Sequence, residues 1–108
     1  MMRRLLFAAL WLASAAFAAD DSNTPATRIV SLAPHLTELA FAAGAGDRIV
    51  ATVEYSDYPA EARAIPRIGD AFRVDMERLL ALEPDLVLVW ETGTPVPTVE
   101  RLRSLGLR

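Results

Sequence analysis

The segment Leu86-Val87-Leu88-Val89-Trp90 decides the fold. Its five apolar residues leave no polar face, and a strand buried on both faces is typical of a parallel sheet covered by helices. Two further strands are predicted at residues 29–32 and 48–53. Helices are predicted between and after the strands, at residues 34–43, 76–82 and 95–105. This alternation predicts an α/β fold, a small parallel sheet with flanking helices.

Local residues mark where the helices begin and end. Pro34 suits the first turn of a helix, and Gly44 and Gly106 suit the position after the last turn. Asp75 is expected to cap the helix that begins at Met76. Helical spacing predicts two buried faces, made by Leu36, Leu39, Ala40 and Ala43 in one helix and by Val96, Val99, Leu102 and Leu105 in another. Between the second and third strands we expect a helical turn at residues 60–64 and a loop at 65–72.

The first 19 residues have the pattern of a secretory signal peptide. Arg3 and Arg4 precede an apolar run, and Ala16-Phe17-Ala18 places cleavage near Ala18 or Ala19. The run is too short to span a membrane and is followed at once by Asp20 and Asp21. The sequence therefore predicts export to the periplasm, with a flexible lead-in at residues 20–27 and a folded lobe at residues 28–108.

The folded part is expected to be incomplete. A fourth strand should follow Gly106, but only Leu107 and Arg108 remain. Three strands alone would leave an open edge and bury little surface. We therefore expect a truncated lobe.

Aromatic residues gather where strands are predicted to end. Tyr55-Ser56-Asp57-Tyr58-Pro59 follows the second strand, and Trp90 ends the third. Ligands of open α/β sheets bind outside the carboxyl ends of the strands. Aromatic rings there offer large apolar surfaces with a polar tip. These residues predict one wall of a ligand cleft, although the tyrosines would also fit a turn that closes over the core.

Other functions are less well supported. The formal net charge of −3 makes the chain a poor partner for nucleic acid, and one histidine without any cysteine predicts no metal site built from side chains. Ser31, His35 and Asp57 contain the residue types of a hydrolase triad, which leaves a secreted α/β hydrolase as the alternative from another class. Ser31 lies inside a predicted strand and lacks a Gly-x-Ser-x-Gly turn, so the prediction is that the chain is not an enzyme.

Several segments resemble a known family: Arg28-Ile29-Val30-Ser31-Leu32-Ala33-Pro34, Thr37-Glu38-Leu39-Ala40-Phe41-Ala42-Ala43-Gly44, Tyr55-Ser56-Asp57-Tyr58-Pro59 and Met76-Glu77-Arg78-Leu79-Leu80-Ala81-Leu82-Glu83-Pro84-Asp85-Leu86-Val87. Together they look like the amino-terminal lobe of periplasmic cobalamin-binding proteins. These are the substrate-binding components of ABC-type vitamin importers, in a class that also carries haem and ferric siderophores. The resemblance implies a Rossmann-like lobe that faces a second lobe across the ligand. It also implies capture of a corrinoid and its delivery to the permease, with cobalamin as transported ligand and no cofactor.

The resemblance also implies roles for individual residues. Tyr55 matches an aromatic that packs on the corrin, and Trp90 matches a second aromatic at the end of the third strand. The backbone at Ala33 and Pro34 matches a loop that approaches the ligand. Ala71 stands where a tryptophan is expected, which leaves Phe72 beside it as the aromatic of that loop. Glu77 matches a glutamate that docks into permease arginines, although its place in a first helical turn is also explained by the helix dipole. His35 stands where cobalamin binders often carry a small residue. Only Arg67 and Arg73 are expected as basic residues on the loop side. Haem and a ferric siderophore therefore remain alternative ligands.

Overall fold

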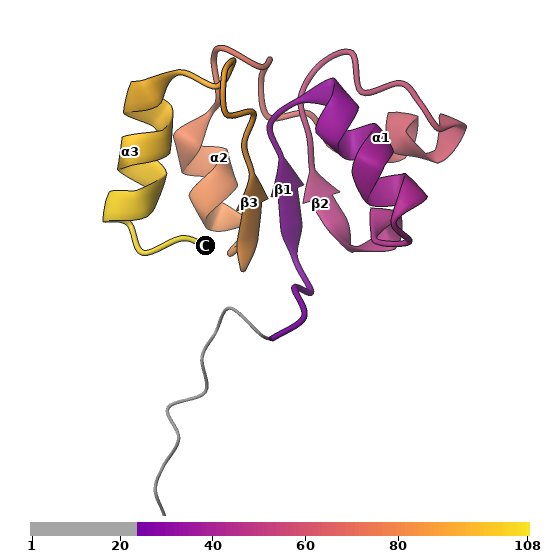
Figure 1. Ribbon diagram of the computed structural model, residues 1–108, viewed down its shortest axis with the longest axis horizontal. Coiled ribbons are helices and arrows are strands. Elements are labelled where there is room, and N and C mark those ends of the chain that lie inside the picture. Colours follow the sequence, from indigo (N-terminus) through magenta and orange to yellow (C-terminus); the bar gives the residue numbers. More distant parts are fainter. Residues whose placement is uncertain (1–23) are drawn as a thin grey trace, which may run out of the picture.

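The computed structural model describes residues 24–108, so the predicted signal peptide and the start of the lead-in lie outside the described residues. Strands and helices alternate as predicted (Figure 1). Their bounds, with two short 3₁₀ helices labelled η, are β1 Ile29–Ser31, α1 Pro34–Ala42, η2 Gly46–Arg48, β2 Ile49–Ala51, η3 Ala60–Ala64, α2 Met76–Ala81, β3 Leu86–Leu88 and α3 Val96–Ser104.

The described strands form one parallel sheet in the order β2-β1-β3. Ile29 of β1 lies opposite Ile49 on one side and Leu86 on the other. The predicted third strand is shorter than expected, because Val89 and Trp90 lie beyond its last residue, Leu88. All three strands run in the same direction, so the loops that follow them meet at one edge of the sheet, at the top of Figure 1.

Helices cover both faces of the sheet, as the α/β prediction requires. Alternate strand residues supply two cores. One core packs α2 and α3 against the sheet through Val30, Leu32, Ala51, Val53, Ile68, Leu79, Val87 and Leu102. The other packs α1 through Ala26, Ile29, Ala40 and Ile49, and the half-buried Leu86 and Leu88 also contact it. Figure 1 shows α1 on one side of the sheet and α2 and α3 on the other.

The buried face of α1 differs from the prediction. Leu39 is 62% exposed and Ala43 is exposed, whereas Thr37 and Ala40 are buried. The reason is polar: the Thr37 hydroxyl is hydrogen-bonded to Ser31 Oγ at 2.9 Å and to Thr52 Oγ1 at 2.8 Å. The helix therefore turns a threonine toward the sheet and leaves a leucine outside.

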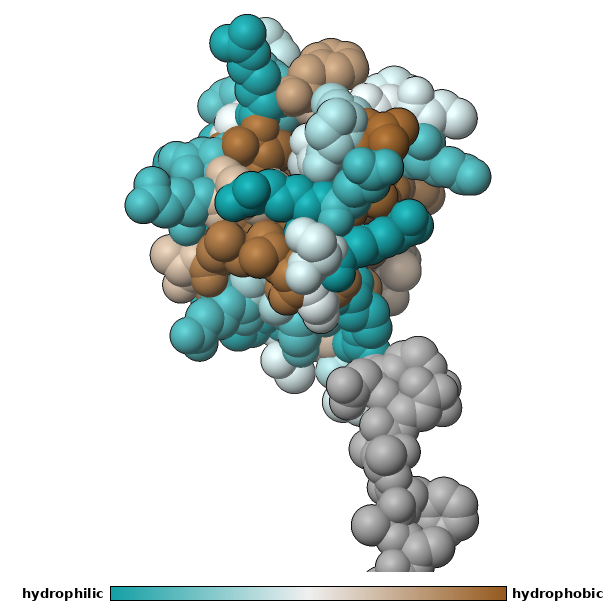
Figure 2. All heavy atoms as spheres, turned by 90° about the vertical axis from the view of Figure 1, so that its left-hand side faces the viewer, coloured by the Kyte–Doolittle hydropathy of each residue, from teal (hydrophilic) through white to brown (hydrophobic). Residues whose placement is uncertain are grey.

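The predicted face of α3 is only partly buried. Leu102 is buried and Val99 half-buried, but Val96 is 66% and Leu105 45% exposed. Because α3 lies beside the outer strand β3, only a narrow strip of the helix faces the core. A shallow hollow of about 180 Å³ runs along this edge, between Val89, Val99 and Leu107. Figure 2 shows this face, where hydrophobic residues are interrupted by hydrophilic ones.

The predicted helix ends are confirmed. Gly44 and Gly106 have φ of +83° and +76°, a backbone conformation that glycine adopts without a steric cost. Asp75 caps α2, since its carboxylate accepts a hydrogen bond from the Arg78 amide at 3.1 Å.

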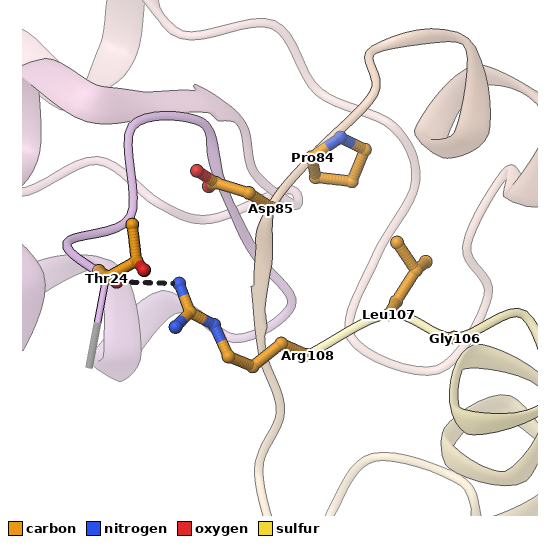
Figure 3. A pocket seen from close by; sticks show the side chains of 6 residues that line it. All are labelled: Thr24, Pro84, Asp85, Gly106, Leu107 and Arg108. Atoms are coloured by element: carbon orange, nitrogen blue, oxygen red, sulfur yellow. Dashed lines mark hydrogen bonds between the residues drawn. The ribbon is translucent and has the colours of Figure 1, made fainter. Parts of the chain in front are cut away.

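The last residues of the predicted lead-in contact the lobe. The Asp85 carboxylate accepts hydrogen bonds from the amides of Thr27 and Arg28 at 2.8 and 2.9 Å, and these bonds lower its pKa. Arg108 donates to the Thr24 carbonyl at 3.0 Å (Figure 3). This corner lies at the amino ends of the strands, opposite the predicted ligand wall. Within residues 24–108, no helix has the length and hydropathy needed to cross a membrane.

Candidate functional site

The predicted ligand wall lies at the carboxyl edge of the sheet. Pro34 follows the central strand β1, Trp90 follows β3 on one side, and Tyr55 and Phe72 lie on the long connection after β2 on the other side. Tyr55 is 80% exposed, Phe72 64% and Trp90 37%. Three partly or largely exposed aromatic rings therefore come from two connections at the same edge of the sheet, where the sequence placed Tyr55 and Trp90.

Trp90 is fixed by the tight turn that follows it. Its amide donates to the Thr94 hydroxyl at 2.8 Å, and its carbonyl accepts from the amides of Gly93 and Thr94. A side chain at Gly93 would overlap the indole ring, so only glycine lets the ring fold over the turn. His35, whose role the sequence left open, contacts the indole edge-on with ring centroids 5.3 Å apart. His35 and Trp90 therefore form one aromatic pair that joins α1 to the loop after β3.

Tyr55 has an unusual backbone. Its φ is +71°, in the left-handed region that bulky residues rarely adopt. The neighbouring Tyr58 is 70% exposed but lies elsewhere. It lines a hollow of about 490 Å³ over α1, together with Glu38, Phe41, Ala42, Pro59 and Glu61. The structure thus assigns the two tyrosines of this loop to different surfaces.

The Phe72 loop is closed by a carboxylate. Asp70 Oδ1 accepts hydrogen bonds from the amides of Phe72 and Arg73, both at 2.8 Å. These two bonds lower the pKa of Asp70. The short turn that carries Phe72 is bounded by a bridge between Gly69 and Val74.

Ala33 and Pro34 differ in what they present. Ala33 is fully buried, and its carbonyl accepts from the Thr37 amide at 3.1 Å and from the Ser31 hydroxyl at 3.2 Å. Pro34 is half-buried. Of these two residues, only Pro34 is partly exposed at the edge of the sheet, and Ala33 is buried beside it.

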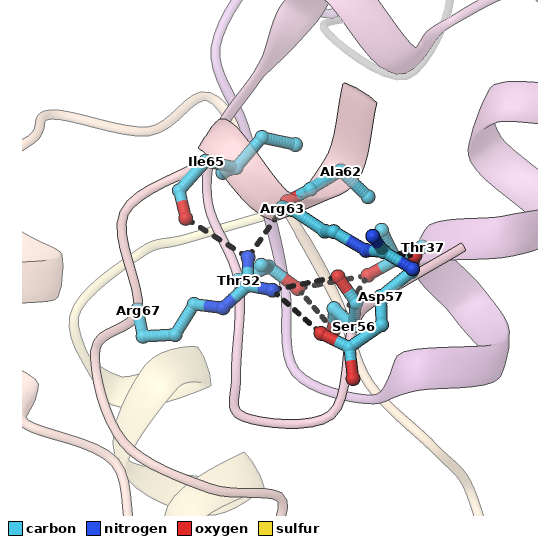
Figure 4. A network of polar contacts seen from close by, with 8 residues as sticks. All are labelled: Thr37, Thr52, Ser56, Asp57, Ala62, Arg63, Ile65 and Arg67. Atoms are coloured by element: carbon cyan, nitrogen blue, oxygen red, sulfur yellow. Dashed lines mark hydrogen bonds and ion pairs between the residues drawn. The ribbon is translucent and has the colours of Figure 1, made fainter. Parts of the chain in front are cut away.

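Arg67 does not act as a free base beside a ligand. Its guanidinium donates to the carbonyls of Ser56 at 2.7 Å, Ala62 at 2.7 Å and Ile65 at 2.9 Å (Figure 4). It also lies 3.4 Å from the Asp57 carboxylate, as an ion pair. Of the two arginines that the sequence placed on the loop side, only Arg73 is exposed.

Glu77 is exposed in the first turn of α2, as the sequence predicted. The elements of a hydrolase, by contrast, are not assembled. Ser31 is fully buried and its hydroxyl is hydrogen-bonded to Thr37 and to the Ala33 carbonyl. His35 contacts Trp90, and Asp57 pairs with Arg67. Among residues 24–108, no three acidic, histidine or cysteine side chains are placed to share a metal ion.

Sequence reasoning missed the contacts of the residues that hold the predicted ligand wall in place. These residues are Ser31, Thr37, Thr52 and Ser56, with their buried hydroxyls, together with Arg67, Gly93 and Thr94. The sequence does contain one indication of these contacts: polar residues lie within otherwise apolar strand and helix faces, and a buried hydroxyl needs a hydrogen-bond partner.

Comparison with known proteins agrees with this fold. A family model described as periplasmic binding protein matches residues 29–104, and the chain belongs to this family. The vitamin B12-binding protein of Vibrio campbellii is 44% identical over 108 residues, which cover 99% of this chain and 38% of the relative. The crystal structure of the periplasmic vitamin B12 binding protein of Vibrio cholerae is 48% identical, with a TM-score of 0.74 over 77% of this chain and 32% of that one.

A periplasmic heme-binding protein from Roseiflexus is also similar. It is 36% identical, with a TM-score of 0.69 over 77% of this chain and 32% of that one. The chain spans about a third of the length of the relatives it matches.

Proposed function

We propose that this chain forms one wall of a cobalamin site in a periplasmic binding protein that delivers the corrinoid to an ABC importer. The observation that carries the proposal is the aromatic edge of the sheet. A corrin ring is large and has extended apolar faces, and exposed aromatic rings at the carboxyl ends of parallel strands suit such a surface. Tyr55, Phe72 and Trp90 supply the rings, and Pro34 the floor between them.

Sequence identity favours a corrinoid over haem. The compared relatives named for vitamin B12 are 37–49% identical, and the compared heme-binding structures are 25–36% identical. An open wall buries little of a large ligand, whereas tight sites enclose most of it. The proposed site is therefore completed by a second lobe, as the family resemblance implies.

Calorimetry on the full-length protein tests the ligand. Cyanocobalamin is expected to bind more tightly than hemin or a ferric siderophore, and Tyr55→Ala or Trp90→Ala is expected to cost roughly 1–3 kcal/mol of binding free energy. Tyr58→Ala is the matched control, because Tyr58 lines the hollow over α1. Folded Tyr55→Ala and Trp90→Ala variants that bind like the parent would exclude the site, and tighter binding of hemin would favour the haem alternative.

We assign Glu77 to contact with the permease. An exposed carboxylate in the first turn of α2 is accessible to an arginine of a partner, with which it would form a charge-assisted pair. Glu77→Gln is expected to weaken association with the membrane complex and to leave cyanocobalamin affinity unchanged. The opposite pattern would place Glu77 in the ligand site. Export follows from the proposed signal peptide, and the mass of the mature protein tests cleavage near Ala18 or Ala19.

A further inference from the structure

The Tyr55 ring has little around it to fix its position. It is 80% exposed, so its placement depends on the backbone that carries it. That backbone is left-handed, with φ of +71°, which costs a bulky residue free energy and persists only where the surroundings impose it. Some other part of the molecule must therefore hold the loop.

Both neighbours of Tyr55 are held by hydrogen bonds. On one side, the Glu54 amide donates to the Gly69 carbonyl at 2.8 Å. On the other, Ser56 is 1% exposed and makes two kinds of contact. Its carbonyl accepts from Arg67 at 2.7 Å, and its hydroxyl is hydrogen-bonded to Thr52 Oγ1 at 2.9 Å.

The hydroxyl contacts continue into the core (Figure 4). Thr52 Oγ1 is hydrogen-bonded to Thr37 Oγ1 at 2.8 Å, and Thr37 in turn to Ser31 Oγ at 2.9 Å. All four hydroxyl-bearing residues are 0–1% exposed. Fully satisfied buried polar networks of this kind rigidify what they join.

The network reaches the other half of the ligand wall. Thr37 lies in the first half of α1, two residues after His35, which contacts Trp90. The chain of hydroxyls from Ser56 through Thr52 to Thr37 thus ties the Tyr55 loop to the helix that holds the aromatic pair of His35 and Trp90. The two sides of the wall share one rigid connection.

We propose that Thr52, at the centre of this hydroxyl network, is a positioning residue that fixes the Tyr55 ring for ligand binding. The affinity part of this proposal rests on the proposed corrinoid site. The part that concerns the loop does not, because a loosened loop is measurable without any ligand.

The ligand-free test is limited chymotrypsin digestion of the full-length protein, followed by mass spectrometry. Thr52→Val keeps the shape of the side chain and removes the two short hydroxyl contacts, to Thr37 and to Ser56, while the longer contact of 3.4 Å between Thr37 Oγ1 and Ser56 Oγ remains. Cleavage after Tyr55 should become several-fold faster, because proteolysis of an exposed loop follows its local opening. Cleavage after Phe72 should stay at the parent rate, and it serves as the internal control.

The binding test is a double-mutant cycle read by cyanocobalamin affinity. Thr52→Val is expected to weaken binding roughly tenfold, and Thr52→Ser, which keeps a hydroxyl, to restore it to near the parent value. In a Tyr55→Ala background the loss caused by Thr52→Val should disappear, because Thr52 acts through the Tyr55 ring. Thr98→Val on α3 is the matched control, outside the network, and should change neither affinity nor cleavage.

The outcomes separate the two proposals. If the parent protein fails to bind cyanocobalamin, the proposed corrinoid site is refuted. If Thr52→Val still accelerates cleavage after Tyr55 in that case, the proposal that Thr52 positions the Tyr55 loop stands. Parent-like cleavage and affinity in Thr52→Val, or a full affinity loss that persists in the Tyr55→Ala background, would refute the positioning role. Should Thr52→Val fail to fold, Ser56→Ala removes the outermost hydroxyl and is expected to give the same pattern.

Discussion

The Tyr55 loop and the Phe72 loop lie on the same connection, between β2 and α2, but they are held by opposite means. The Tyr55 loop is fastened from inside by buried hydroxyls and by the Arg67 guanidinium. The Phe72 loop is held at the surface, where the Asp70 carboxylate accepts hydrogen bonds from the amides of Phe72 and Arg73. Hydroxyls stay neutral and a guanidinium stays charged in acid, whereas a carboxylate such as that of Asp70 loses its charge. The comparison teaches that two neighbouring aromatic residues can be presented with different rigidity and different sensitivity to pH.

Arg67→Met should show the largest effect, because it removes the strongest fastening of the Tyr55 loop. Three carbonyl oxygens would lose a charged donor, and those of Ser56 and Ala62 belong to buried residues. We expect the free energy of unfolding of the full-length protein to fall by about 2–4 kcal/mol, as measured by urea denaturation. Arg73→Met, in the exposed Phe72 loop, should change it by less than about 0.5 kcal/mol. Equal losses in the two variants would remove the distinction between the loops.

Glycine substitutions should have opposite signs in the two loops. Tyr55→Gly relieves a left-handed tyrosine, and we expect a net gain of about 0.5–1 kcal/mol after the added freedom of the unfolded chain is counted. Phe72 has no such backbone, so Phe72→Gly should lose about 0.5–1 kcal/mol. Urea denaturation of both variants measures the difference, and a loss at position 55 would show that the ring stabilises the fold. Tyr55→Gly should also weaken cyanocobalamin binding, so stability and affinity would change in opposite directions.

Lowering the pH should loosen the Phe72 loop before the Tyr55 loop. Of the changes predicted here, this one should alter the free energy of unfolding least. The amides of Phe72 and Arg73 hold the pKa of Asp70 below its usual value in the folded state. A carboxylate with a lowered pKa contributes stability above the unfolded pKa of about 3.9, and this contribution is lost as pH falls through the folded value. The NMR shifts of the Phe72 and Arg73 amides should therefore be constant from pH 7 to 5 and change below about pH 4.

Asp70→Asn is the control for this titration. The asparagine keeps an acceptor oxygen and cannot ionise, so the acid-induced change at the Phe72 amide should vanish. The Tyr55 amide should follow neither change. A Tyr55 amide that titrates together with Phe72 would mean that the two loops move as one unit.

Local patterns in the sequence determined much of this fold. Strand positions, the parallel arrangement and the helix ends at Gly44 and Gly106 follow from hydrophobic runs, strand–helix alternation and the conformational freedom of glycine. Sequence also placed Tyr55 and Trp90 at the carboxyl edge of the sheet, because the carboxyl ends of parallel strands meet there. These features depend on neighbours in the chain or on the direction of strands, and both can be read from the order of residues.

Tertiary structure decided which side chains face the core and which partners they have there. Helical spacing predicted that Leu39 is buried. Instead, Thr37 faces the sheet, because its hydroxyl is hydrogen-bonded there to the hydroxyls of Ser31 in β1 and Thr52 after β2. The sequence suggested that Arg67 is a free base. In the structure its guanidinium donates hydrogen bonds to backbone carbonyls, one of which belongs to Ser56, eleven residues earlier in the chain. Such choices depend on groups that folding brings together from separate segments, and spacing along one helix or strand carries no record of them.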